Sequence, residues 1–247
     1  MPTFSSDGVE IAYREAGEGP PVLLIHGFGS NIVVNWGDTG WISTLANAGH
    51  RVIALDNRGH GASAKLYDKT DYAAPLMAED ARRLLDHLGI GEADVMGYSM
   101  GARISAFLAI AHPARVRRLV LAGLAANMID GVPGGEAIAQ ALEAESMADV
   151  AGAEPRAFRK FAEQTRSDLK ALAACMRSAR EKIDREALAR IRCPVLVVAG
   201  ELDDIAGPVA PLVDAIPNAK GVVLPRRNHM NAVGDRDFKA AVVEFLA

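Results

Sequence analysis

The chain has 247 residues, 50% of them hydrophobic and 23% charged, which is the composition of a folded globular protein and excludes a disordered or fibrous chain. With 27 Lys and Arg against 31 Asp and Glu, the net charge is −4, and no basic block favours nucleic acid or an anionic membrane surface as a partner. The two cysteines, Cys175 and Cys193, are too few for a disulfide framework or a metal site.

The opening segment lacks the basic start and the apolar run of a secretory signal. No apolar stretch approaches the ~18 residues that a membrane span needs. We therefore expect a soluble, cytoplasmic protein.

Short apolar runs predict β-strands, and segments with helical periodicity separate these runs. Most of the runs are continuous rather than alternating, which is typical of parallel strands covered on both faces. The first run alternates, which predicts an antiparallel strand at an edge of the sheet. The runs are Val9–Tyr13, Val22–Ile25, Val52–Leu55, Ala93–Met96, Leu119–Ala122, Val195–Ala199 and Gly221–Leu224.

Two helices are predicted between these strands, over Tyr72–Leu88 and Ser99–Ala111, and the second ends before Pro113. The alternation of strands and helices predicts an α/β fold with a doubly wound, mostly parallel sheet and right-handed crossovers.

Residues 124–190 break this alternation, because they contain helical sequence and no convincing strand. The segment Gly131–Gly135 interrupts them, and Pro155 opens a further predicted helix, Arg156–Arg180. We predict a helical cap over the carboxyl edge of the sheet, where open α/β sheets bind ligands. The core would then comprise residues 1–123 and 191–247. A long crossover packed on one face of the sheet is the alternative.

The segment Gly97-Tyr98-Ser99-Met100-Gly101 lies between a predicted strand and a predicted helix. The G-x-S-x-G elbow needs this context, since its serine sits in a strained turn and its glycines let strand and helix approach closely. The motif predicts Ser99 as a nucleophile near a helix N-terminus. A glycine-rich turn without chemistry is the alternative.

Acyl transfer also needs donors aimed at the oxyanion of a tetrahedral intermediate. One donor is expected after the nucleophile and one in the loop after an early strand, here His26-Gly27-Phe28-Gly29. The backbone N–H groups of Phe28 and Met100 are therefore the candidates for an oxyanion hole. His26 lies inside this tight loop, which favours a bracing role over that of a general base.

The base and the acid are expected in the order serine, acid, histidine along the chain. His229 lies in a loop after the last predicted strand, whereas His112 directly precedes Pro113. The strand Val195–Ala199 runs into three carboxylates, of which Asp203 is placed to reach back toward the His229 loop. Glu201 and Asp204 remain the alternatives for the acid.

These residues make the chain similar to the α/β-hydrolase superfamily, and the similarity runs nearly end to end. The resemblance implies that Ser99 is the nucleophile, Asp203 the acid and His229 the base, with no metal or organic cofactor. The common form of the last motif has glycine before the histidine, where this chain has Asn228. The motifs are His26–Gly29, Asp56–Ser63, Gly97–Gly101, Gly200–Asp203 and the His229 loop.

Other family features bear on structure and substrate. The Asp56–Ser63 segment resembles the family's structural loop after strand four, and we expect Asp56 and Arg58 to pair with each other there. Residues 31–36 resemble ring-cleavage-product hydrolases, and residues 98–103 resemble the menaquinone-synthesis lyase. In such a lyase Arg103 would bind a substrate carboxylate, and the alternative is an arginine on the helix surface.

The expected reaction is hydrolysis of a carboxylic ester of a small molecule. A serine at position 99 argues against the haloalkane dehalogenases and epoxide hydrolases of the superfamily, which use aspartate there. C–C bond hydrolysis and lyase chemistry on the same residues remain alternatives, as does a non-catalytic binding protein.

In the predicted cap, Phe158 and Phe161 are candidates to line the substrate pocket, and packing within the cap is the alternative. The sequence leaves the identity of the substrate and the oligomeric state open.

Overall fold

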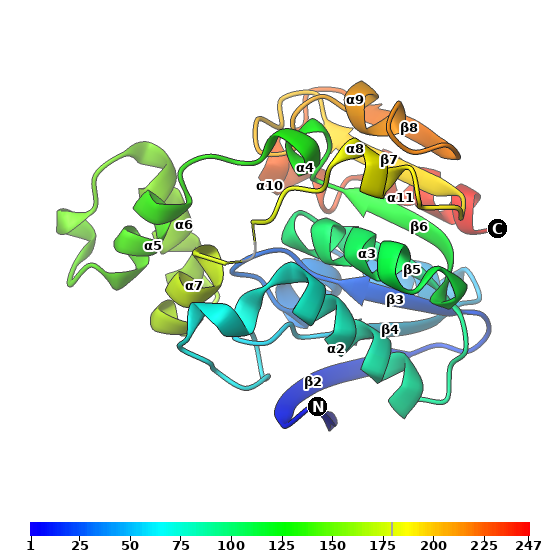
Figure 1. Ribbon diagram of the computed structural model, residues 1–247, viewed down its shortest axis with the longest axis horizontal. Helices are drawn as coiled ribbons and strands as arrows, with labels where there is room; N and C mark the ends of the chain where they lie inside the picture. The colour runs from blue at the N-terminus through cyan, green and yellow to red at the C-terminus, as the bar shows by residue number, and fades with distance from the viewer. Residues whose placement is uncertain (179) are drawn as a thin grey trace.

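The computed structural model describes residues 1–178 and 180–247. Within these residues, eight strands form one sheet in the order β1-β2-β4-β3-β5-β6-β7-β8. Figure 1 labels the strands from β2 to β8. The strands from β4 to β8 in this order pair in parallel, whereas β1 and β2 are antiparallel to their neighbours. This arrangement confirms the predicted fold class. The strands are β1 Thr3–Ser6, β2 Val9–Ala16, β3 Pro21–Ile25, β4 Arg51–Leu55, β5 Ala93–Tyr98, β6 Val116–Ala122, β7 Val195–Gly200 and β8 Ala219–Leu224.

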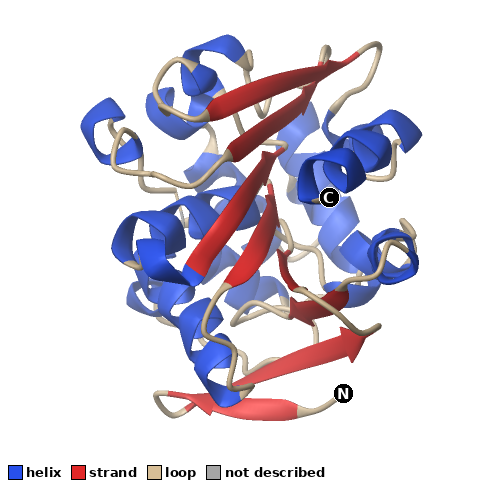
Figure 2. Ribbon diagram, turned by 90° about the vertical axis from the view of Figure 1, so that its right-hand side faces the viewer, coloured by secondary structure: helices blue, strands red, loops and turns tan. Residues whose placement is uncertain are grey.

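Helices cover both faces of the sheet (Figure 2). They are α1 Trp41–Asn47, α2 Ala74–His87, α3 Met100–Ala111, α4 Ala126–Asp130, α5 Gly135–Glu143, α6 Ala153–Gln164, α7 Leu169–Met176, α8 Arg185–Leu188, α9 Ala210–Val213, α10 His229–Ala232 and α11 Arg236–Leu246. No helix in the described ranges is both long enough and apolar enough to cross a bilayer.

Alternate residues of the central strands enter two separate apolar cores. On β3, Leu23 and Ile25 face the core under α2 and α3, while Val22 and Leu24 face the core under α1 and α11. Both sets are fully buried, which explains why the central strands read as continuous apolar runs. Burial on both faces fixes the register, because a shift by one residue would exchange the two sets.

The N-terminal part of the sheet differs from the prediction. The alternating strand β2 is antiparallel, as predicted, but it is not at the edge, because β1 pairs along its outer side. Thr3–Ser6 is short and mostly polar, so its pattern alone does not distinguish it from a loop. Only its pairing with β2 makes it a strand.

The predicted helix over Arg156–Arg180 is also wrong as a single helix. It is divided into α6 and α7, and Arg166 between them has a left-handed φ of 54°. Asp168 then begins α7, since its side chain accepts from the backbone N–H groups of Lys170 and Ala171. An aspartate that caps the next helix competes with continuation of the first.

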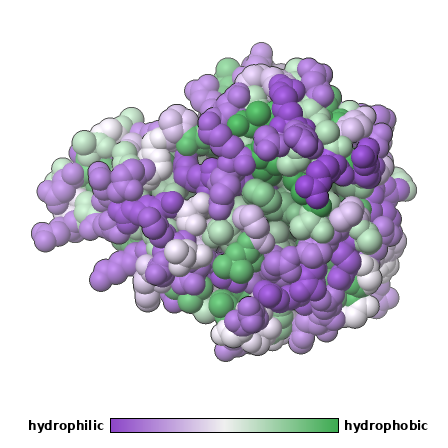
Figure 3. Space-filling view, in the orientation of Figure 1, coloured by the Kyte–Doolittle hydropathy of each residue, from purple (hydrophilic) through white to green (hydrophobic). Residues whose placement is uncertain are grey.

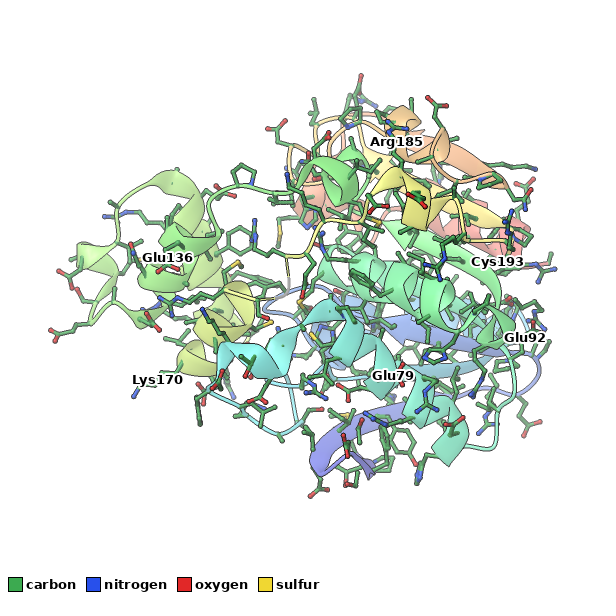
Figure 4. The ribbon with its side chains drawn as sticks, viewed as in Figure 1. Glu79, Glu92, Glu136, Lys170, Arg185 and Cys193 are labelled. Carbon is green, nitrogen blue, oxygen red and sulfur yellow. The ribbon has the colours of Figure 1, made fainter. Side chains whose placement is uncertain are left out.

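Helices α5, α6 and α7 form a separate lobe beside the carboxyl ends of the strands (Figure 1). The lobe has an apolar cluster of its own, and α4 and α8, at the two ends of the 124–190 segment, contact α9 and α3 of the core. Glu136 on α5 and Lys170 on α7 mark the lobe in Figure 4, and Glu136 pairs with Arg177 at 3.0 Å. Hydrophilic residues cover much of the face drawn in Figure 3.

The turn between β5 and α3 depends on two glycines that have no room for a side chain. A Cβ on Gly101 would lie 1.9 Å from the carbonyl oxygen of Ile25, and one on Gly97 would lie 2.2 Å from the carbonyl oxygen of Gly101. These contacts bring the start of α3 against β3 and β5. The turn residue between them is therefore held by backbone packing.

We predict that Gly101→Ala lowers the free energy of unfolding by about 3 kcal/mol, because the new methyl group forces β3 and α3 apart. Urea unfolding followed by circular dichroism measures the change. Gly91→Ala is the matched control, since no described residue beyond its two chain neighbours lies within 4 Å of its Cβ position, and it should change stability by about 1 kcal/mol or less. Equal stabilities of the two variants would contradict this account of the turn.

Candidate active site

Ser99 occupies the tight turn between β5 and α3. Its φ of 56° and ψ of −116° form a backbone conformation that non-glycine residues rarely adopt. The Ser99 N–H donates to the carbonyl oxygen of Ala122 on β6 at 2.7 Å. The strained turn is thus tied to the neighbouring strand, and the Ser99 side chain emerges at the first turn of α3.

His229 and Asp203 meet Ser99 from two distant parts of the chain. Nε2 of His229 lies 3.1 Å from Oγ of Ser99, and Nδ1 lies 2.9 Å and 3.0 Å from the two carboxylate oxygens of Asp203. An ionised carboxylate can only accept, so Nδ1 carries the proton and Nε2 is left to accept from the serine hydroxyl. The three side chains form one chain of hydrogen bonds.

Of the three carboxylates that follow β7, Asp203 alone is buried, with 4% of its surface exposed. The Ala206 N–H also donates to it at 2.9 Å, so the carboxylate is held from two sides. Glu201 and Asp204 are exposed, and Glu201 accepts from the Arg226 N–H instead of facing His229. The geometry brings Asp203, and neither neighbour, to the imidazole.

Asn228 explains how the His229 loop dispenses with the usual glycine. Its backbone is extended, with φ −103° and ψ −179°, so no left-handed residue is needed there. The Asn228 side chain accepts from the N–H groups of Met230 and Asn231 and begins α10 at His229. This N-cap fixes the histidine at the first position of a short helix.

Two backbone N–H groups are free beside Ser99. Neither the Phe28 N–H nor the Met100 N–H donates to any residue within the ranges that the structure describes. Met100 is the first residue of α3, where helical N–H groups have no acceptor within the helix. The adjacent Gly27 N–H is occupied by Asn35 at 3.1 Å. The arrangement leaves the two predicted donors available to an oxyanion.

His26 lies in the same loop, fully buried. Its Nδ1 is 2.7 Å from the Gly27 carbonyl oxygen, and its Nε2 accepts from the Asn57 N–H at 3.0 Å. Both ring nitrogens are therefore engaged within the loops. Burial lowers the pKa of His26 to about 4, so the ring is neutral near pH 7.

The expected pair between Asp56 and Arg58 does not form. Asp56 accepts from the backbone N–H groups of Ile32 and Ala62, whereas Arg58 reaches α2 and pairs with Asp80 at 2.7 Å. Arg58 lies in a turn after β4, so its direction does not follow from strand alternation, and only the position of α2 decides which carboxylate Arg58 meets.

A cavity of about 60 Å³ adjoins Ser99. Its walls include Phe28 and Met100 from the core, and Phe158 and Met176 from the lobe. The Phe158 ring packs against Phe28 with 6.0 Å between centroids. A larger, open groove of about 870 Å³ lies between residues 67–69 and α7, and Ser99 is not among its walls.

Two other predicted residues take different positions. Phe161 is not part of the described wall of this cavity, since its ring packs over Gly29 of the His26 loop. Arg103 lines the cavity but is only 3% exposed, so the alternative of an arginine on the helix surface is wrong. The guanidinium donates to the carbonyl oxygen of Glu181.

Tyr98 contacts the His229 segment directly, a role that the sequence did not reveal. Its hydroxyl donates to the carbonyl oxygen of His229 at 2.5 Å, and the two ring centroids lie 5.3 Å apart. The ring fills the space above Gly123, where a Cβ would approach it to 2.8 Å. The residue before Ser99 therefore braces the backbone of His229.

Comparison with known proteins identifies the family of the chain that carries these residues. A family model described as the alpha/beta hydrolase fold matches residues 20–182. The chain belongs to this family. The resemblance stated from the sequence motifs is thereby confirmed, and the chain is a member of a hydrolase family.

The similar proteins match different shares of this chain. The 2-hydroxymuconate semialdehyde hydrolase of Pseudomonas putida is 42% identical over 116 residues, which are 47% of this chain. The chain spans 40% and 41% of the length of that protein and of the same hydrolase from Pseudomonas sp. strain CF600. The enol-lactonase of Burkholderia xenovorans LB400 is 26% identical, with a TM-score of 0.85 and 99% of both chains covered. A hydrolase from Pseudomonas aeruginosa PA01 is 28% identical, with a TM-score of 0.81.

We predict that Tyr98→Phe lowers the reaction rate of Ser99 about tenfold, because one lost hydrogen bond loosens the His229 backbone by roughly 1 kcal/mol or somewhat more. The phenyl ring keeps the packing over Gly123, so the substitution removes only the hydrogen bond. The rate of labelling by a fluorophosphonate measures the reactivity of Ser99. Tyr67→Phe is the control, because its hydroxyl donates to Asp168 in an exposed hydrogen bond and neither residue lines the Ser99 cavity. If Tyr98→Phe is labelled at the same rate as the parent, the hydrogen bond from Tyr98 does not support the reactivity of Ser99.

A further prediction concerns acid stability. Burial lowers the pKa of His60 to about 3 and that of His26 to about 4, each from 6.5. The unfolded chain binds protons below pH 6.5 that the folded chain does not bind, so the free energy of unfolding falls as the pH falls from 6.5 toward 4. Each histidine contributes about 1.4 kcal/mol per pH unit. The raised pKa of Asp56 opposes part of this loss.

Urea unfolding between pH 7 and 4.5 measures the slope. His60→Asn removes the titration while keeping a donor toward the Arg58 carbonyl oxygen, which accepts from His60 at 2.9 Å. We expect its slope to be smaller than that of the parent by about 1.4 kcal/mol per pH unit. Parallel slopes would show that His60 does not control acid stability.

Proposed function

We propose that this α/β hydrolase cleaves a carboxylic ester, open-chain or cyclic, through an acyl-enzyme on Ser99. The observation that carries the proposal is the hydrogen-bonded chain from Ser99 to His229 to Asp203, with distances of 3.1 Å and 2.9 Å. Nucleophile, base and orienting acid are the three parts that activation of a serine requires.

In the first half-reaction, Oγ of Ser99 attacks the ester carbonyl carbon while Nε2 of His229 takes its proton. Asp203 holds the imidazole in the required tautomer and stabilises the imidazolium. The carbonyl oxygen becomes an oxyanion that the Phe28 and Met100 N–H groups bind. Collapse of this intermediate expels the alcohol, which takes the proton from His229.

In the second half-reaction, water attacks the acyl carbon and gives its proton to His229. The same two N–H groups bind the second oxyanion, and its collapse releases the carboxylic acid while Ser99 recovers its proton. These steps need no group beyond the residues named and water. Since a histidine must give up protons as well as take them, partial exposure of the His229 side chain, 15%, is suited to both steps.

Ester cleavage is named first because the enol-lactonase has the higher TM-score, 0.85, against 0.78 for a meta-cleavage product hydrolase of Pseudomonas fluorescens IP01 that also matches the whole chain. A lactone is a cyclic ester, and the enol-lactonase matches 99% of this chain. C–C bond hydrolysis remains the second candidate, because 2-hydroxymuconate semialdehyde hydrolases match about half of the chain at 37% to 42% identity. Both reactions would use the same three side chains.

The lobe bears on this proposal through the cavity. We infer that residues 124–190 act as a cap and that Phe158 and Met176 contact the acyl group, since both line the cavity with Ser99. Apolar walls with few polar groups are typical of sites that select small molecules. The substrate would be enclosed between the lobe and the Ser99 turn.

A fluorophosphonate probe and a substrate panel test the proposal. We expect stoichiometric labelling of the parent at Ser99 and none of Ser99→Ala, with a loss of esterase rate of about 10³-fold or more. The panel compares p-nitrophenyl esters of increasing chain length with a lactone and a ring-cleavage product. Absence of labelling at Ser99 would favour a binding protein, and preference for the ring-cleavage product would favour C–C hydrolysis.

Variants of the acid complete the experiment. Asp203→Asn should lower kcat by about 10²–10⁴-fold, since the amide does not hold the imidazole in the required tautomer. Asp204→Asn is the matched control and should change kcat little, because Asp204 is exposed. The reverse ranking would move the acid to Asp204.

A further inference from the structure

Two arginines line the cavity beside Ser99. Arg103 lies one turn along α3, about 6 Å of helix rise beyond Ser99. Arg180 follows α7 in the 124–190 segment and lines the same cavity. The walls of this small and mostly apolar cavity therefore include two arginine side chains and the proposed nucleophile.

Neutral groups accept every hydrogen bond that the two guanidinium groups donate within the described residues. Arg103 donates to the Glu181 carbonyl oxygen. Arg180 donates to the carbonyl oxygens of Val132 and Pro133, at 2.6 Å and 3.0 Å, and to Sδ of Met176. These contacts orient both side chains without neutralising them.

The lack of an ion pair separates the buried Arg103 and the half-buried Arg180 from the buried Arg58 and Arg159. Arg58 pairs with Asp80 at 2.7 Å and Arg159 pairs with Glu163 at 2.7 Å. In residues 1–178 and 180–247, no carboxylate lies within 4.0 Å of Arg103 or Arg180.

The pKa shifts agree with this geometry. Burial lowers the pKa of Arg103 to about 10, and the charge of Arg180 lowers it further against the opposing effect of Glu181. Burial also lowers the pKa of Arg180, which Glu154 partly opposes. Two like charges held in a small, poorly hydrated space are unfavourable until an anion joins them.

We propose that the acyl part of the substrate carries a carboxylate, which binds between Arg103 and Arg180 while Ser99 attacks the ester carbonyl. The inference rests on the proposed function and narrows the substrate to half-esters or lactones of short dicarboxylic acids. The small volume of the cavity, about 60 Å³, favours a short acyl chain. The acyl part is the one that remains on Ser99 through both half-reactions, so a fixed anchor acts on both.

This anchor would come from two independent parts of the chain. Arg103 belongs to the core helix that begins at the nucleophile, and Arg180 belongs to the segment that carries the lobe. A carboxylate that contacts both would hold that segment against the core when substrate is present. Guanidinium groups suit this role, because they keep their charge and match a carboxylate with paired donors.

A pair of isosteric substrates tests the proposal. Monomethyl glutarate carries the carboxylate, and the methyl ester of glutaric acid monoamide has the same shape without the charge. We expect kcat/KM for the half-ester to exceed that of the amide by about 30-fold or more. Arg103→Met and Arg180→Met should each reduce this ratio to within a few-fold of one, mainly through KM. Arg156→Met, exposed on α6 of the lobe, is the control and should keep the parent ratio.

Two further measurements keep the outcomes separate. Fluorophosphonate labelling and thermal unfolding establish that each variant is folded, and calorimetry measures glutarate binding to Ser99→Ala with and without the arginine substitutions. Binding that is lost in both arginine variants supports the site. Equal rates on the two esters, unchanged by the substitutions, would overturn it while the proposed function stands. If Ser99 is not labelled and neither ester reacts, the proposed function fails, and glutarate binding alone decides for or against the carboxylate site.

Discussion

The contact between Gly101 and the Ile25 carbonyl oxygen holds the start of α3 against β3. With a Cβ position only 1.9 Å from that oxygen, no other residue fits without moving a central strand. This closeness forces Ser99 into its left-handed turn and turns its hydroxyl toward the carboxyl edge of the sheet. The same approach places the free Met100 N–H beside the hydroxyl, so the positions of the proposed nucleophile and of one proposed oxyanion donor follow from a single packing constraint.

The charged side chains around this turn fall into two groups, those whose charge is held by hydrogen-bond donors and those without an ion-pair partner. Asp203 is buried, yet it accepts from His229 and from the Ala206 N–H, so its charge is held by donors. Within the part of the chain that the structure describes, only neutral acceptors orient Arg103 and Arg180. A buried charge without a partner is unfavourable for folding, and such groups in proteins are commonly found where a ligand of opposite charge binds. The carboxylate proposed for the substrate gives these two arginines that partner.

The braces around the site are mostly contacts between residues far apart in sequence. Tyr98 holds the His229 carbonyl oxygen, His26 accepts from the Asn57 N–H, and Arg58 ties the loop after β4 to α2 through Asp80. Each contact ties a segment at the carboxyl end of a strand to another part of the chain. Side chains held in this way lose little freedom when a substrate binds, which is the condition for a preorganised site.

The sequence by itself determined the parallel sheet and the Ser99 turn, because the apolar strand runs and the glycine spacing around Ser99 are local patterns that report backbone geometry directly. It also predicted His229 as the partner of Ser99, from its place in the loop after the last strand. It favoured Asp203 over Glu201 and Asp204 without showing which of them is buried. It did not predict the break before Asp168 or the pair between Arg58 and Asp80. It contained no sign that Tyr98 contacts His229 or that Arg180 reaches the cavity. Those contacts depend on which distant segments pack together. The burial of a side chain and its distance from residues on other segments are set by the assembled sheet and lobe, and no periodic pattern in the sequence reports them.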